Sequence, residues 1–214
     1  MSNQLDHQVK TFILASMSPR RKELLAYLGI PFEQKPSNCD ETPTIRRPRE
    51  MVQELAHRKA DFIARELSKE GRRNLLVVGS DTTVSINNTI LEKPADNNEA
   101  KKMLKLLSGK THQVYTGVSL IHVSEEGHCD EVFNFCEKTD VLFDHLTDTT
   151  LDSYLRSEHV LDKAGAYGIQ GMALSFISGI NGCFASVMGF PLARFKKELF
   201  TYLEENQFQL SHKS

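Results

Sequence analysis

Several features are absent from this chain of 214 residues, and each absence excludes a class of protein. The four cysteines form no CxxC pair, so the sequence indicates neither a disulfide scaffold nor a zinc site with ordinary ligand spacing. No run approaches the roughly 18 apolar residues of a membrane span, and the polar N-terminus is not a secretory signal. The net charge is only -2, so no overall field attracts nucleic acid or an acidic membrane. We therefore expect reduced thiols and a cytoplasmic protein.

The composition that remains, 40% hydrophobic and 25% charged residues, is typical of a soluble globular protein. Strand-like and helix-like segments intermix without an internal repeat or a linker. This order predicts an α/β or mixed α+β fold around a shared sheet. We expect one domain over residues 11–207, between a frayed N-terminus (1–10) and a C-terminal tail (208–214).

Apolar periodicity and turn residues predict the individual elements. The predicted strands are Phe12–Ala15, Ile30–Lys35, Leu75–Ile86, Ile90–Pro94, Thr111–Val123, Glu131–Phe143 and a segment beginning at Phe176. The predicted helices are Pro19–Leu28, Arg49–Leu67, Glu99–Leu107 with Asn97 or Asn98 as its cap, Thr149–Ser157 started by Asp148, and Leu192–Glu205.

The stretch Thr11–Gly29 combines a buried-type strand, a small polar turn and a helix that begins with two arginines. Ser18 is a good N-cap and Pro19 a good first helical residue. A helix N-terminus carries unpaired N–H groups and partial positive charge, and arginine matches the geometry of phosphate. The stretch therefore indicates an anion site that includes Arg20 and Arg21. The competing interpretation is a capped helix with a basic surface turn.

Asp81 follows the buried-type strand Leu75–Ser80. We expect this strand to lie beside Phe12–Ala15, with their carboxyl ends at one crevice. A carboxylate there suits Mg²⁺, which binds one or two carboxylates plus substrate phosphates, or it can take a proton from water. The competing interpretation is a turn or cap aspartate. Asp40 and Glu41, in a turn-rich loop, are either solvated acids or metal ligands.

Two lysines and a glutamine complete the candidate set. Lys59 lies on a helix with an apolar face, and Lys93 ends an extended segment. Each suits phosphate, although most lysines are simply solvated. Gln170, between glycines, has an amide that suits a pyrimidine imide, or it faces water. Together these residues meet the needs of a nucleoside triphosphate site. The P-loop pattern GxxxxGK[ST] is absent, which disfavours a kinase or motor ATPase.

The sequence LASMSPRRKELL from Leu14 to Leu25 resembles the LASxSPRRxELL signature of the Maf family. Further blocks match the family in order, over about Phe12 to Leu199. These blocks are Asp40-Glu41, Ala56–Ala60, Gly79–Thr82, Leu91–Pro94, Leu107–Val118, Asp162–Gly171, Asn181-Gly182 and Val187–Leu192. Departures are minor: Thr83 stands where an aliphatic residue is common, and Asn87–Thr89 replaces a glycine-containing turn.

The resemblance implies an α/β fold of the Maf/inosine-triphosphatase type, with an elongated mixed central sheet and two lobes flanking a cleft. It implies hydrolysis of a nucleoside triphosphate to the monophosphate and pyrophosphate with Mg²⁺ or Mn²⁺, a role in clearing modified nucleotides, and a homodimer. By position, Asp81 is the expected catalytic base, and Glu41 and Asp81 the metal ligands. The expected phosphate-binding residues are Ser16, Arg20, Arg21, Lys59 and Lys93.

The family divides by substrate, and three positions point to the branch that hydrolyses dTTP and UTP. Arg20, Thr82 and Gln170 match that branch. The sister branch, which acts on 7-methyl-GTP, carries tryptophan, glutamine and glutamate there. A non-catalytic nucleotide-binding regulator of cell division is disfavoured by the intact acids and lysines. A nucleic-acid-binding protein is disfavoured by the net charge of -2. The residues do not separate dTTP from UTP.

Overall fold

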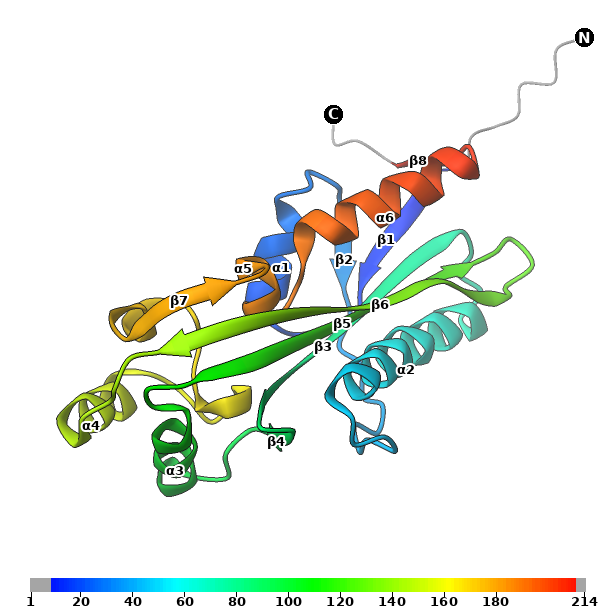
Figure 1. Ribbon diagram of the computed structural model, residues 1–214. Coiled ribbons are helices and arrows are strands. Elements are labelled where there is room, and N and C mark those ends of the chain that lie inside the picture. The colour runs from blue at the N-terminus through cyan, green and yellow to red at the C-terminus, as the bar shows by residue number, and fades with distance from the viewer. Residues whose placement is uncertain (1–8, 211–214) are drawn as a thin grey trace, which may run out of the picture.

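The computed structural model describes residues 9–210 of the chain. Its centre is an eight-stranded mixed sheet with the strand order β2-β1-β3-β5-β6-β7, to which β4 adds beside β3 and β8 beside β1 (Figure 1). The strands are β1 (Val9–Leu14), β2 (Phe32–Gln34), β3 (Leu75–Ile86), β4 (Thr89–Leu91), β5 (Thr111–Val123), β6 (Cys129–Phe143), β7 (Ile177–Asn181) and β8 (Gln209–Leu210). The predicted α/β fold with a mixed central sheet is confirmed.

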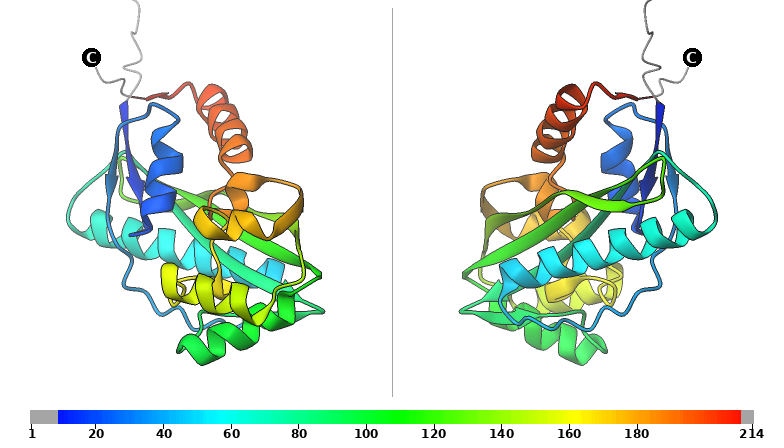
Figure 2. Two further views of the ribbon diagram at one scale, coloured as in Figure 1. Left: turned by 90° about the vertical axis from the view of Figure 1, so that its left-hand side faces the viewer. Right: turned by 90° about the vertical axis from the view of Figure 1, so that its right-hand side faces the viewer.

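Helices cover both faces of this sheet and one of its ends (Figure 2). They are α1 (Pro19–Ala26), α2 (Pro48–Lys69), α3 (Asn97–Leu107), α4 (Asp148–Ser157), α5 (Phe184–Val187) and α6 (Leu192–Glu205), with the 3₁₀ turns η1 (Ala164–Ala166) and η2 (Gly171–Ser175). Helix α2 lies along one face, α1 and α6 lie on the other, and α3 and α4 gather at the far end of the long strands. Among the described residues, no helix is long and apolar enough to cross a membrane.

Alternation along β1 explains why two faces are covered. Phe12 and Leu14 pack with α1 and α6 in one apolar cluster, whereas Ile13 packs against α2 in another. Successive strand residues point to opposite faces, so a strand buried on both sides is apolar throughout. The predicted pairing of β1 with β3 is confirmed, and it is parallel, with Leu14 opposite Val78. Because β3 continues to Ile86, the end of β1 lies beside the middle of β3 and not beside its carboxyl end, which corrects the predicted meeting of the two ends.

A third apolar cluster lies at the other end of the long strands β3, β5 and β6. There Val84, Val114 and Val141 pack with side chains of α3 and α4. The first half of β3, from Leu75 to Val78, belongs to the other two clusters. The middle of β3 therefore crosses from one core to the next, and this middle carries Ser80, Asp81 and Thr82.

Two glycines let α2 approach the sheet closely at this crossing. A Cβ atom on Gly79 would lie 2.2 Å from the carbonyl oxygen of Ala56, and one on Gly117 would lie 2.2 Å from that of Val52. Both distances are far below van der Waals contact, so only glycine fits. Gly117 is also the β5 partner of Asp81. The close packing therefore brings the middle of α2, with Lys59, next to Asp81.

Most predicted elements are present, with small corrections at their ends. Asp96 caps α3 and Thr147 caps α4, each upstream of the predicted residue. The sequence missed α5 and β8. Strand β1 begins at Val9 and pairs with β8, so residues 9–10 and 209–210 belong to the sheet rather than to frayed ends. The remaining terminal predictions, for residues 1–8 and 211–214, lie outside the described residues.

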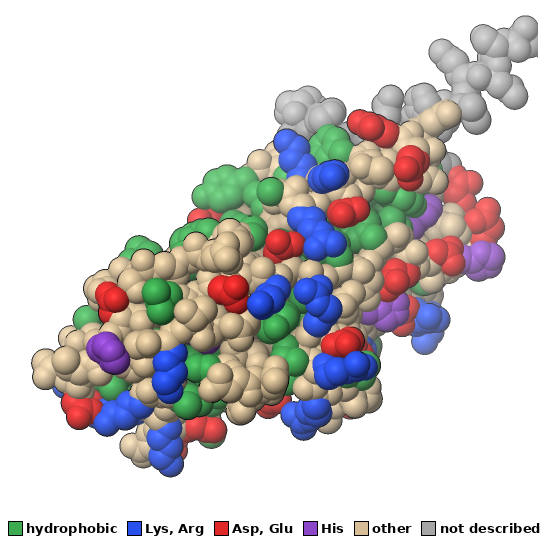
Figure 3. Space-filling model, in the orientation of Figure 1, with side chains coloured by type: hydrophobic (Ala, Val, Ile, Leu, Met, Phe, Trp, Pro, Cys, Tyr) green, Lys and Arg blue, Asp and Glu red, His purple; other side chains and the backbone are tan. Residues whose placement is uncertain are grey.

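The surface carries mixed charge. Figure 3 shows acidic and basic side chains interspersed over the face in view, without a continuous basic stripe. A basic stripe is the electrostatic footprint expected of a nucleic-acid-binding surface. This face therefore gives no support to a nucleic-acid-binding function.

Candidate active site

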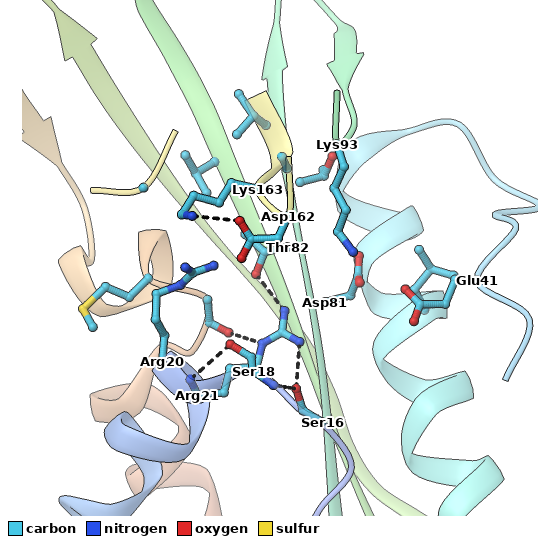
Figure 4. A pocket seen from close by; sticks show the side chains of 18 of the residues that line it. Ser16, Ser18, Arg20, Arg21, Glu41, Asp81, Thr82, Lys93, Asp162 and Lys163 are labelled. Carbon is cyan, nitrogen blue, oxygen red and sulfur yellow. Dashed lines mark hydrogen bonds and ion pairs between the residues drawn. The ribbon is translucent and has the colours of Figure 1, made fainter. Parts of the chain in front are cut away.

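The crossing between the cores opens into a cleft of about 630 Å³. Pockets for small molecules in proteins span roughly 300–1,000 Å³, so the cleft has room for a nucleotide. It is lined by the start of α1, residues 36–43, one face of α2, the middle of β3, the segment after β4, and residues near 162–169 and 187–189. Figure 4 shows Arg20 and Arg21 on one side of it, with Glu41, Asp81 and Lys93 on the other.

Lys59 joins the two predicted metal ligands. Its Nζ atom lies 2.7 Å from Oδ1 of Asp81 and 2.8 Å from Oε2 of Glu41. The Lys59 and Asp81 side chains are 9% and 13% exposed, whereas Glu41 is 50% exposed. A cation between two carboxylates reduces their mutual repulsion and keeps both ionised groups at one edge of the cleft.

Arg21 is fixed by contacts to three separate segments. Its Nε donates to the carbonyl oxygen of Gly189 at 3.0 Å, Nη1 to the Ser16 hydroxyl at 3.3 Å, and Nη2 to the Thr82 hydroxyl at 3.3 Å. A guanidinium has five N–H donors, so two of them are left by these contacts. No described carboxylate lies within ion-pair distance of Arg21. Its charge is therefore free to meet an anion in the cleft.

Burial and neighbouring charges both shift the pKa of Arg21. Burial lowers the pKa of its guanidinium from the usual value, the charges of Asp81 and Glu41 raise it, and Arg20 lowers it further. A cation taken from water is destabilised unless an opposite charge approaches it. The arriving anion would supply that charge.

The start of α1 has the local structure that the sequence predicted. The Ser18 hydroxyl accepts a hydrogen bond from the Arg21 backbone N–H, and Pro19 begins the helix. The Ser16 hydroxyl accepts from the Ser18 N–H at 3.2 Å as well as from Arg21. Gln34 holds this turn by donating to the Ser16 carbonyl oxygen at 2.7 Å.

A line of hydroxyl groups supports the base of the cleft. Thr82 and Thr116 are opposite each other on β3 and β5, and their hydroxyl oxygens are 3.0 Å apart. The Thr116 hydroxyl donates to the Ser186 carbonyl oxygen at 2.7 Å. The Ser80 hydroxyl donates to the Gly189 carbonyl oxygen at 3.0 Å. Thr82, assigned to base choice by the resemblance, is thus also a support for Arg21.

The remaining predicted cations are less constrained. Arg20 lines the cleft, and Lys93 lines it from an exposed position after β4. Beside Arg20 lies Asp162, whose carboxylate accepts a hydrogen bond from Lys163 at 2.8 Å. Although burial acts to raise it, the contact with Lys163 and the charges of Lys163 and Arg20 hold the pKa of Asp162 below its ordinary value.

Gln170 is the one predicted site residue that the structure places apart from the others. It is exposed and does not line the cleft, whereas its neighbours Gly168 and Ile169 do. Its amide lies on the turn before η2, which begins at Gly171 with φ of +68°. Its predicted role in reading the base therefore stays a prediction.

The carboxylate oxygens of the site suit a divalent cation that is bound to the phosphates of a nucleotide. The described residues contain no group of three or more His, Cys, Asp or Glu side chains that could hold a metal ion. Magnesium is usually bound by one or two carboxylates together with substrate phosphates. Asp81 and Glu41, linked through Lys59, would supply such a pair of hard oxygen ligands.

Sequence reasoning missed several residues that the structure brings to this site. Asp162, Lys163, Thr116 and Gly189 lie in blocks that match the family but were given no role. Gly189 and Thr116 act through a carbonyl and a hydroxyl group on partners distant in sequence. The one available signal was the adjacency of Asp162 and Lys163 to the glycine-rich loop.

Comparison with known proteins assigns the chain to a family. The family described as Maf-like protein matches residues 11–202. A curated Bacillus cereus protein (strain ATCC 10987 / NRS 248) named dTTP/UTP pyrophosphatase is 45% identical over 192 residues, covering 89% of both chains. A Bacillus cytotoxicus protein of the same name is 46% identical over 192 residues, covering 89% of this chain and 95% of the relative. The match extends over the whole cleft, and this chain belongs to the Maf family.

Proposed function

We propose that this chain hydrolyses dTTP and UTP to the nucleoside monophosphate and pyrophosphate. The observation that carries the proposal is the grouping of Asp81, Lys59 and Glu41 across one cleft from the arginine-bearing start of α1. The curated relatives named dTTP/UTP pyrophosphatase support the choice of reaction and substrate. The match of Arg20, Thr82 and Gln170 to that branch agrees with this choice.

Each part of the cleft has a task in this reaction. Arg21, with two donors remaining, and the positive end of α1 hold the triphosphate, and Ser16 keeps Arg21 oriented. Arg20 and Lys93 add positive charge at the mouth. Lys59 holds the Asp81 and Glu41 carboxylates beside the phosphate to be attacked and adds positive charge there. Asp81 orients a water and takes its proton as the water attacks the α-phosphorus.

We propose Mg²⁺ or Mn²⁺ as the cofactor, held by Asp81 and Glu41 together with the substrate phosphates. When bound, such an ion neutralises phosphate charge and lowers the pKa of water. The chain's own residues perform the positioning: Lys59 contacts both carboxylates and holds them within reach of one point.

Base choice is proposed to depend on hydrogen-bond polarity. Thymine and uracil share an O4 acceptor beside an N3–H donor, and the Gln170 amide can pair with both. Cytosine reverses that order, so an amide held in the orientation that pairs with thymine or uracil would leave polar groups unpaired. Because Gln170 is exposed and does not line the cleft, this pairing requires the turn before Gly171 to approach the base.

The test is a substrate panel with the purified chain and Mg²⁺, with products separated by chromatography. It should include dTTP, UTP, CTP, the purine triphosphates and 7-methyl-GTP. We expect dTTP and UTP to give monophosphate and pyrophosphate with the highest kcat/KM. Orthophosphate as the product would refute the proposed site of attack. Equal kcat/KM for CTP and dTTP would refute the proposed base recognition, and a preference for 7-methyl-GTP would place the chain in the sister branch.

A further inference from the structure

The segment that carries Glu41, residues 35–47, contains no helix or strand. Glu41 itself is 50% exposed, so packing of its own side chain does not fix its position. Something else must hold the backbone on either side of it if its carboxylate is to stay 2.8 Å from Lys59. The residues that do so lie on α2, one turn from Lys59 and beside it.

Arg58 binds the backbone on both sides of Glu41. Its Nη1 atom donates to the carbonyl oxygens of Asp40 and Thr42, each at 2.8 Å. These are the two residues that flank Glu41 in the chain. A planar guanidinium is well suited to hold two acceptors in a fixed arrangement. The Arg58 contacts therefore define where the Glu41 side chain starts.

Glu54 continues this anchorage along the segment. Its carboxylate accepts from the Thr44 hydroxyl at 2.7 Å and from the backbone N–H groups of Thr44 and Ile45 at 3.3 Å. It also forms an ion pair with Nη2 of Arg58, four residues along the helix. The two side chains are 19% and 27% exposed. This pair is shielded enough from solvent for its hydrogen bonds to be worth more than those of a surface pair.

Lys35, at the start of the segment, pairs with Glu66 at 2.8 Å and with Glu70 at 3.2 Å, away from Glu41. The other contacts around Glu41 are weaker. Arg46 pairs with Glu92 at 3.2 Å, but these side chains are 72% and 60% exposed. Asp40 accepts from the Thr42 N–H at 2.8 Å, which shapes the turn without attaching it to the rest of the molecule. Exposed ion pairs contribute little. Arg58 and Glu54 are therefore the main attachment of the stretch around Glu41 to the rigid helix.

We propose that Arg58, supported by Glu54, is a positioning residue that holds Glu41 at the catalytic centre. The inference rests on the proposed function, in which Glu41 and Asp81 act at the phosphates. Arg58 touches neither carboxylate of that pair. Its effect passes through the backbone of the segment to Glu41, while its neighbour Lys59 contacts Glu41 directly.

The test compares Arg58→Met with a control pair on the same helix. Arg65 and Asp61 form an ion pair with the same four-residue spacing, at 2.6 Å, and do not contact the segment. We expect Arg58→Met to lower kcat for dTTP by about 10-fold and to raise the Mg²⁺ concentration needed for half-maximal rate, since supporting residues of this kind typically contribute 10- to 100-fold. Arg65→Met should stay within about 2-fold. Arg58→Lys, which keeps donors for the carbonyl groups, should recover most of the loss.

Two further measurements separate positioning from general loss of structure. In a Glu41→Gln background, Arg58→Met should have almost no additional effect on kcat, because residues that act through one another are not additive. Hydrogen exchange of the amides in residues 38–46 should accelerate in Arg58→Met and not in Arg65→Met, with unfolding midpoints compared for both. If Arg58→Met does not fold, Glu54→Gln takes its place with the same expectations.

The outcomes distinguish the inference from the proposed function. Unchanged exchange and kcat in Arg58→Met, or a full additional loss in the Glu41→Gln background, would overturn the positioning role. Faster exchange in Arg58→Met, together with a wild-type chain that releases no pyrophosphate from dTTP, would overturn the proposed function and leave Arg58 as the anchor of the segment.

Discussion

We call the part of the site around Lys59, Asp81 and Arg21 the fixed end, because its cations are held by neighbours on other elements. At the other part, the open end, the side chains are exposed. Lys59 is fixed between two carboxylates and Arg21 by three acceptors. Lys93 and Gln170 are exposed instead. Preorganised charges cost no rearrangement during reaction, so the first end suits catalysis. The second end suits recognition that is completed when substrate arrives.

The largest expected effect comes from the fixed end. Asp81→Asn should lower kcat for dTTP by about 10³-fold, since a positioned general base contributes 10²- to 10⁴-fold. Asp40→Asn is the matched control: Asp40 adjoins Glu41, but its carboxylate bonds to Thr42 within its own turn, and asparagine can keep the bond from the Thr42 N–H and the backbone carbonyl that Arg58 contacts. It should stay within about 3-fold. Steady-state kinetics with product analysis measures both, and wild-type turnover in Asp81→Asn would remove Asp81 from the mechanism.

Lys59 and Lys93 test the comparison between the fixed end and the open end, because the same type of residue lies at each. Lys59→Met should lower kcat by about 100-fold, because it removes a fixed charge between two carboxylates. Lys93→Met should mainly raise KM, by about 5-fold, and this effect should fade at high salt because Lys93 is exposed. Kinetics at two ionic strengths measures the difference. A larger loss of kcat in Lys93→Met than in Lys59→Met would contradict the assignment of catalysis to the fixed end.

Base choice is the smaller effect at the open end. Gln170→Glu should reduce the preference for dTTP over CTP by about 10-fold, since a carboxylate cannot donate to O4. The kcat for the best substrate should change little, because Gln170 lies outside the cleft lining. Direct competition between the two nucleotides in one reaction gives the ratio. An unchanged ratio would exclude Gln170 from base recognition.

His112 lies outside both ends of the site. Its replacement should change the pH dependence of the free energy of unfolding and leave kcat almost unchanged. It is fully buried, with Nε2 2.7 Å from the Tyr167 hydroxyl, and burial lowers its pKa to about 4. The unfolded chain, with a His pKa near 6.5, binds the proton first. The free energy of unfolding therefore has its full value above about pH 6.5, and it falls by about 2 kcal/mol between pH 7.5 and pH 5.

Urea unfolding at the two pH values measures this loss. His112→Gln should remove it, while the same change at the exposed His145 should retain it. An identical pH dependence in all three chains would assign the loss to other groups.

The sequence predicted those parts of the fold that have strong local patterns. The bounds of β5 and α6 coincide with the predicted ranges because their apolar patterns run unbroken between turn residues. Helix α5 has four residues, too few for a periodic pattern. Strand β8 pairs with β1 across nearly the whole chain, a contact that no local pattern encodes.

The site residues show the same difference between local patterns, which the sequence predicts, and long-range contacts, which it does not. Arg21 at a helix start has a local signature, and so does Asp81 at the end of a buried apolar run. The meeting of Asp81 with Lys59 depends on the close approach that Gly79 and Gly117 allow, which is a property of the packed sheet and helix. Arg58 escaped prediction because its partners are backbone carbonyl groups, which every residue has.

The most direct test of the account is the destination of solvent oxygen. Hydrolysis of dTTP by the wild-type chain in ¹⁸O-labelled water, followed by mass spectrometry of both products, reports which phosphorus the water attacks. The account predicts one ¹⁸O atom in the thymidine monophosphate and none in the pyrophosphate, with Asp81→Asn lowering the rate without moving the label. Label in the pyrophosphate would show attack at the β-phosphorus and would contradict the assignment of the cleft.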